Sequence, residues 1–125
     1  MNFLAVFLGG GIGATIRYLI SIITPKNLYN MPCHTLLANF LGCFLASIVA
    51  TIFIYKSNLN PIYKTLLITG FCGGLSTLSA FSLETVNFLQ NGSYFKAFSY
   101  ITTSLLVCIA SVLLGIFIVK KLLTL

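Results

Sequence analysis

The stretch GFCGGLSTLSAFSLE, residues 70–84, decides the fold, because its polar content does not match its apolar surroundings. It lies inside a segment long enough to cross a membrane. Yet it holds three glycines within five residues, then hydroxyl and small side chains, then Glu84, the only carboxylate in the chain. Glycine costs about 1 kcal/mol per residue relative to alanine inside a helix, and frayed backbone is tolerated in lipid only where protein or a water-filled cavity surrounds it. The stretch therefore predicts a broken membrane helix, with the break at the glycines, beside an ion or solute path.

The composition of the whole chain is that of an integral membrane protein. Its 125 residues are 58% hydrophobic and 6% charged, whereas a soluble domain carries about 25% charged residues. A membrane-spanning helix takes about 20 residues, so four spans with short loops nearly exhaust the length. We expect one all-α membrane domain over residues 1–125, with spans at about 3–23, 33–54, 65–89 and 97–119. Four helices enclose little interior, so a pathway is expected to need a second copy.

The net charge of +6 does not indicate a nucleic-acid partner, because the seven cations are scattered along the chain. Lysines at such positions more often mark helix ends at lipid headgroups. The four cysteines lack the spacing of metal ligands, and we interpret them as small apolar packing residues.

The distribution of cations also predicts how the chain sits in the membrane. With four spans, both termini and the second loop share one side, and the lysines of the two sides are Lys56, Lys64, Lys120 and Lys121 against Lys26 and Lys96. This bias is too weak to specify one orientation. We therefore expect a protein that inserts both ways and pairs as an antiparallel dimer about a two-fold axis in the membrane plane.

Polar residues in the other spans leave alternatives open. Arg17 lies about two-thirds along the first span, where it either extends to the nearer interface or faces a wet cavity. Thr35 and Asn39 are four residues apart and share one helix face. A carboxamide this deep is costly unless it is paired, so Asn39 either bonds a neighbouring helix or presents a donor to a pore. His34 is expected near the interface without a functional role.

The fourth span carries a polar stripe, because Tyr100, Ser104 and Cys108 step by four along one face. Such side chains either bond back to carbonyls of their own helix or form a track for a permeating ion.

Three motifs in order now resemble one family: GGGIGATIRY at residues 9–18, TLLAN at residues 35–39 and the stretch at residues 70–84. Together they resemble the Fluc (CrcB) fluoride channels, and the resemblance covers essentially the whole chain. It implies a multi-pass protein of the bacterial inner membrane that exports fluoride passively and is not an enzyme. It also implies an antiparallel homodimer with two pores, in which the broken third helices cross at a structural Na⁺.

The resemblance further implies roles for individual residues. The backbone carbonyls of Gly73 and Ser76 would hold the sodium ion, with Arg17, Thr35 and Glu84 in supporting positions. The fluoride pathway would comprise Asn39, Thr77, Ser79, Phe81, Tyr100, Ser104 and Cys108. The chemistry is consistent with those roles, because an amide and hydroxyls can donate to an anion that gives up its water, and an aromatic ring has a positive edge.

The chain departs from the family pattern within the same stretch. Where the family usually has Thr-Thr-Phe-Ser-Thr-Phe, this chain has STLSAF at residues 76–81. Leu78 thus replaces the first of two pore phenylalanines and Ala80 lacks a hydroxyl. Cys108 also replaces a hydroxyl of the polar track. We expect slower conduction, or a heterodimer with a paralogous Fluc subunit.

Two other functions remain as alternatives. A small dual-topology exporter would exchange protons for a cation or drug at a membrane carboxylate, for which Glu84 is the only candidate. A non-conducting partner subunit of a heterodimeric channel is the other.

Overall fold

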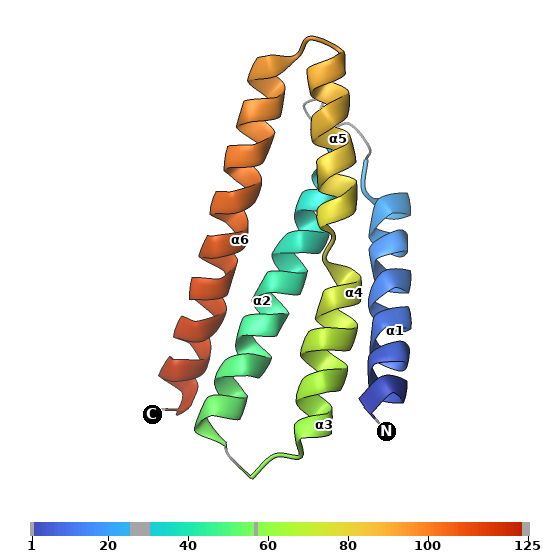
Figure 1. Ribbon diagram of the computed structural model, residues 1–125. Coiled ribbons are helices and arrows are strands. Elements are labelled where there is room, and N and C mark those ends of the chain that lie inside the picture. Colours follow the sequence, from blue (N-terminus) through green and yellow to red (C-terminus); the bar gives the residue numbers. More distant parts are fainter. Residues whose placement is uncertain (1, 26–30, 57, 124–125) are drawn as a thin grey trace.

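The computed structural model describes residues 2–25, 31–56 and 58–123, and within those ranges the chain forms helices and no strands (Figure 1). Four segments are long and apolar enough to cross a membrane: α1 (Asn2–Ile23), α2 (Cys33–Tyr55), the composite segment Pro61–Gln90 and α6 (Tyr94–Leu123). The all-α class and the four apolar helices are therefore as predicted. The third and fourth segments run beyond the expected bounds of 65–89 and 97–119.

The third segment is built from four pieces: α3 (Pro61–Lys64), the π-helical η1 (Thr65–Cys72), α4 (Gly73–Leu75) and α5 (Leu78–Gln90). It begins at Asn60, whose side chain accepts a hydrogen bond from the Ile62 amide at 3.0 Å, with proline at the first helical position. Between α4 and α5 the backbone is extended, with ψ of 155° at Ser76 and 122° at Thr77. The segment is thus interrupted near its middle.

The prediction that the glycines themselves break the helix is wrong. Gly70 lies within η1, and Gly73 and Gly74 lie within α4. The interruption comes two residues after the last glycine. The glycines instead bring two backbones together, because an added Cβ at Gly74 would overlap the carbonyl oxygen of Gly10. The role of these glycines is therefore close packing against α1. Their low intrinsic helix propensity does not interrupt the helix at these positions.

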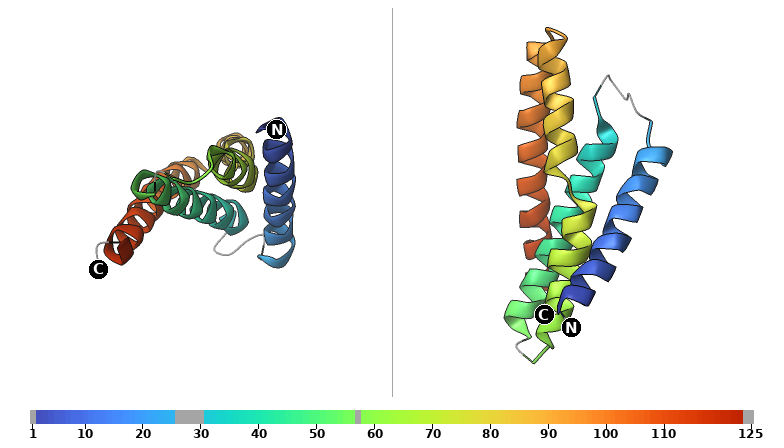
Figure 2. Two further views of the ribbon diagram at one scale, coloured as in Figure 1. Left: turned by 90° about the horizontal axis from the view of Figure 1, so that it is seen from below. Right: turned by 45° about the vertical axis from the view of Figure 1, so that its right-hand side comes forward.

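The helices form a row, with α1 at one side of the molecule and α6 at the other (Figure 2). α1 packs on η1 and α4, α2 packs along α6, and α5 packs on α6. Gly9 and Gly13 of α1 face the backbone of η1, as small residues do where membrane helices approach closely. The start of α1, the end of α2, the start of α3 and the end of α6 lie at one end of the bundle, and the turn between α5 and α6 lies at the other (Figure 1).

The described lysines lie at the two ends of the bundle in the groups expected from four alternating spans. Lys56 follows the end of α2, Lys64 lies near the start of the third segment, and Lys120 and Lys121 lie in the last turn of α6, all at the end of the bundle where α1 starts. Lys96 lies in the first turn of α6, near the α5–α6 turn. Lys26, the remaining lysine of the expected weak bias, lies outside the described residues.

The close α1–η1 contact can be tested with two alanine substitutions. A Cβ at Gly13 would overlap the Phe71 carbonyl, so we expect Gly13→Ala to lower the stability of the folded protein by about 1–3 kcal/mol, as overpacking does. At Gly11 nothing lies within 4 Å, so Gly11→Ala should be neutral or stabilise by up to about 1 kcal/mol through helix propensity. Thermal unfolding in detergent measures both. Equal midpoints for the two variants would contradict the packing described here.

Candidate functional site

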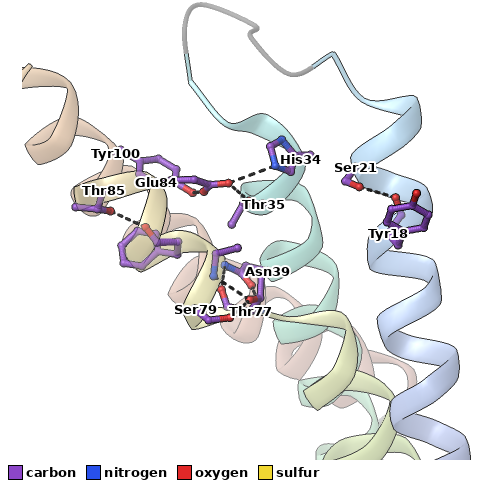
Figure 3. A network of polar contacts seen from close by, with 12 residues as sticks. Tyr18, Ser21, His34, Thr35, Asn39, Thr77, Ser79, Glu84, Thr85 and Tyr100 are labelled. Atoms are coloured by element: carbon purple, nitrogen blue, oxygen red, sulfur yellow. Dashed lines mark hydrogen bonds and ion pairs between the residues drawn. The ribbon is translucent and has the colours of Figure 1, made fainter. Parts of the chain in front are cut away.

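The interruption of the third segment is held by one side chain of α2. The Thr77 amide donates to Asn39 Oδ1 at 2.6 Å, and Asn39 Nδ2 donates to the Thr77 carbonyl at 3.1 Å (Figure 3). Both backbone groups of an extended residue within the membrane thus find partners, which lipid could not supply. Of the two interpretations left open for Asn39, the structure shows the bond to a neighbouring helix. One Nδ2 proton is not used by this pair.

The same arrangement frees two carbonyl oxygens from their helical donors. In a continuous α-helix the carbonyl of residue i accepts from the amide of residue i+4, so Gly73 would pair with Thr77 and Ser76 with Ala80. The Thr77 amide goes to Asn39 instead. The Ala80 amide donates to Thr77 Oγ1 at 3.2 Å, which caps the N-terminus of α5. The carbonyls of Gly73 and Ser76 are therefore released beside the break.

A third carbonyl at the end of α4 contacts α1. Arg17 Nε donates to the Gly74 carbonyl at 3.1 Å, so the arginine bonds the end of a half-helix, where a cation is favoured by the helix dipole. Arg17 also lines a cavity of about 280 Å³ between α1, α2 and the start of α5, together with Ala14, Tyr18, Ser21, His34, Thr35, Thr77 and Ala80. The structure thus favours the cavity-facing interpretation of Arg17 over extension to the interface.

The lone carboxylate is organised by donors from two other helices. Thr35 Oγ1 donates to Glu84 Oε1 at 2.7 Å, and Tyr100 Oη donates to Glu84 Oε2 at 2.7 Å (Figure 3). His34 Nε2 lies 3.3 Å from Oε1. The side chains of His34 and Glu84 are 24% and 21% exposed, so the carboxylate is largely buried. Residues of α2, α5 and α6 meet at this one group.

The polar stripe of α6 runs on from Tyr100 along the buried side of that helix. The Phe81 ring lies 5.1 Å from the Tyr100 ring, centroid to centroid. Ser104 is buried and its hydroxyl has no hydrogen-bond partner among the described residues, so this side chain does not bond back to its helix. Ser111 does, donating to the Cys108 carbonyl at 2.7 Å. Cys108 is partly buried on the same face.

Two of the residues singled out from the sequence are exposed in the single subunit. Leu78 is 75% exposed and Ser79 is also exposed. The Ser79 hydroxyl lies 3.1 Å from Thr77 Oγ1. Within one chain, therefore, the Ser79 hydroxyl stays in contact with Thr77 at the break, while the Leu78 side chain is left uncovered. The other predicted residues are connected through Thr77 and Thr35, because Arg17 lines a cavity with both, Asn39 bonds Thr77 and Glu84 bonds Thr35.

His34 is the residue of this site that the sequence interpretation missed. A signal was available, because the only histidine and the only carboxylate of an apolar chain fall at segment ends expected on the same membrane side. The start of the second span and the end of the third meet there when four spans alternate in direction.

Four apolar helices, one of them interrupted by a bonded asparagine, define a small multi-pass membrane protein with a polar site at the depth of the bilayer. The chain belongs to the family described as CrcB-like protein, Camphor Resistance (CrcB), whose model matches residues 4–116.

Three of its relatives match over more than nine-tenths of their length. The "Fluoride-specific ion channel FluC" of Hydrogenobaculum sp. (strain Y04AAS1) is 42% identical over 118 residues, covering 94% of this chain and 97% of the relative. The protein of the same name from Serratia proteamaculans is 40% identical, covering 94% and 93%. "Fluoride-specific ion channel FluC 2" of Staphylococcus saprophyticus is 40% identical, covering 92% and 97%.

The role of Asn39 in holding the break can be tested by removing its carboxamide. Asn39→Ala leaves the amide and carbonyl of Thr77 without partners, and each such buried group costs about 1–3 kcal/mol. We expect a clearly lower unfolding midpoint in detergent or bicelles. Asn87→Ala is the matched control, because Asn87 is exposed on α5. A midpoint for Asn39→Ala equal to that of the control would mean that the break needs no partner from α2.

Proposed function

We propose that this protein is a subunit of a fluoride-selective channel that lets F⁻ leave the cytoplasm passively across the bacterial inner membrane, without covalent chemistry. The observation that carries the proposal is the likeness, over more than nine-tenths of both chains, to relatives named fluoride-specific ion channels. Such a channel lowers cytoplasmic fluoride, which enters as neutral HF and is trapped when it ionises.

The geometry of the break supports anion passage. α5 begins at the break, and the N-terminal end of a helix favours negative charge through its dipole and unpaired amides. Arg17 and Thr77 line the same cavity, and Asn39 bonds the backbone of Thr77. The buried Ser104 hydroxyl has a proton to offer. These groups could donate hydrogen bonds to an anion that has lost its water, and a small, strongly hydrated ion requires such replacement donors.

A second copy of the chain is supported by what one copy leaves uncovered. Gly73, Leu78 and Ser79 are exposed beside the interruption, and interrupted backbone is tolerated in lipid only where protein or a water-filled cavity surrounds it. We propose that a second, inverted subunit covers this face and forms the antiparallel homodimer. A paralogous subunit in that place, giving a heterodimer, is the alternative that the substitution at Leu78 keeps open.

The freed carbonyls fit a structural sodium ion at the crossing of the two third segments. Unwound backbone carbonyls and half-helix C-termini are typical Na⁺ ligands in membrane proteins, and Gly73 and Ser76 offer such oxygens. No cluster of three or more histidine, cysteine or acidic side chains that could hold a metal occurs among the described residues, so backbone oxygens are the ligands available here. When bound, the ion would fix the crossing and contribute positive charge near the anion path.

The sodium site and the dimer can be tested with Gly73→Ala. Within one subunit an added Cβ there meets only the Ile68 carbonyl at 3.7 Å, so the subunit should still fold. We expect a dimer that is more stable in NaCl than in N-methylglucamine chloride, and a variant in which that difference shrinks at least severalfold. Light scattering during thermal dissociation measures both. Equal dimer stability in the two salts would contradict the proposed sodium site. Cross-links formed only between parallel subunits would contradict the inverted arrangement.

Fluoride efflux from proteoliposomes tests the function itself. With valinomycin as a potassium shunt and no proton gradient, we expect fluoride efflux and no chloride efflux above that of protein-free liposomes. Leu78→Phe should raise the rate roughly fivefold, since an aromatic edge contributes on the order of 1 kcal/mol. Proton-coupled cation uptake that is lost in Glu84→Gln would identify an exporter instead. Efflux only after a second Fluc subunit is added would identify a partner subunit.

A further inference from the structure

The contact between His34 and Glu84 joins the only histidine of the chain to its only carboxylate. His34 lies in the first turn of α2 and Glu84 lies on α5, and Nε2 is 3.3 Å from Oε1. Histidine is the side chain whose charge ordinarily changes between pH 5 and 8. The pair therefore combines a group that can change charge with the only acidic side chain of the chain.

The remaining donors on Glu84 hold it in place whatever the charge on His34. Thr35 donates to Oε1 and Tyr100 donates to Oε2, both at 2.7 Å. His34 and Thr35 also line the cavity that reaches Arg17 and Thr77. The carboxylate is thus fixed next to two residues that line this cavity, so its negative charge opposes the approach of an anion there.

We propose that His34 is a positioning residue that makes fluoride entry depend on pH, by taking up a proton that cancels the charge of Glu84 beside the cavity that His34 and Thr35 line. This inference rests on the proposed channel function. With His34 neutral the pair has a net charge of −1, and with His34 protonated it has a net charge of zero. The repulsion of an entering anion is smaller in the second state, so the rate should rise as pH falls.

The other groups around the pair do not change charge in this range. From α1, Arg17 and Tyr18 line the same cavity, and from α6, Tyr100 contacts Glu84. Arginine stays charged and tyrosine stays neutral at these pH values. Among the described residues that face His34, this leaves Glu84 as the alternative group that could take up a proton.

The two ring nitrogens of His34 have different surroundings, because only Nε2 faces the carboxylate of Glu84. His34 Nδ1 is buried and has no partner among the described residues, so the neutral ring directs its single N–H from Nε2 toward the carboxylate. Protonation adds an N–H at Nδ1 without supplying an acceptor for it. In either charge state the ring thus keeps an N–H at Nε2, the atom that faces Glu84.

The experiment compares fluoride efflux at equal internal and external pH of 7.5 and 5.5, with the HF leak of protein-free liposomes subtracted. We expect the wild-type rate to rise about three- to tenfold at the lower pH, since like-charge repulsion changes rates by such factors. His34→Gln keeps a neutral donor near Glu84, so a merely structural role would survive, and we expect its rate to match the high-pH wild type at both pH values.

A wild-type rate that does not change with pH, or an undiminished pH response in His34→Gln, would overturn the proposal. A second readout does not need transport. Because His34 is the only histidine, its ring resonances can be followed by NMR in nanodiscs, and they should differ between pH 7.5 and pH 5.5. Resonances that do not change between these pH values would also overturn the proposal. Absence of fluoride efflux at both pH values, with the change in the resonances intact, would reject the channel function and leave the proton-dependent pair.

Discussion

The two hydrogen bonds between Asn39 and Thr77 are the interaction on which this structure depends. A membrane helix cannot stop and restart without exposing polar backbone, and lipid offers that backbone no partner. Here one carboxamide from α2 supplies both an acceptor and a donor to the same extended residue. The position of the break follows from the position of Asn39, and the start of α5 follows from the break. The direction of Glu84, two turns further along α5, follows in turn.

The interruption also brings together a helix C-terminus and a helix N-terminus, which carry opposite partial charges. α4 ends with its carbonyls at the break, and the Gly74 carbonyl accepts from Arg17. α5 begins there with its amides, capped by Thr77. A cation is favoured at the first end and an anion at the second. A single break can therefore support both parts of the proposed function, the structural sodium ion and the fluoride path, without any further charged side chain at that depth.

The sequence was sufficient for features that depend on local composition. Four apolar helices follow from the length and hydropathy of the segments, and an interrupted third helix follows from polar residues in an apolar run. Helix propensity is a local property and predicts a break at the glycines, whereas contact between Gly74 and Gly10 of α1 accompanies a helical backbone there. The convergence of Thr35, Tyr100 and His34 on Glu84 depends on the rotation of three helices about their axes. No spacing within one segment determines that, and the arrangement of a second subunit is likewise not fixed by a single chain.

The hydrogen bonds of the site also differ in the order in which synthesis makes them possible. Asn39 precedes Thr77 by 38 residues, so the partner of the break is already in the bilayer when the break emerges. Thr35 and His34 likewise precede Glu84. Tyr100 follows Glu84 by 16 residues and arrives only with the last helix. The carboxylate therefore enters the membrane with its α2 partners ready, and the arrival of α6 completes its coordination as the final step of assembly within the subunit.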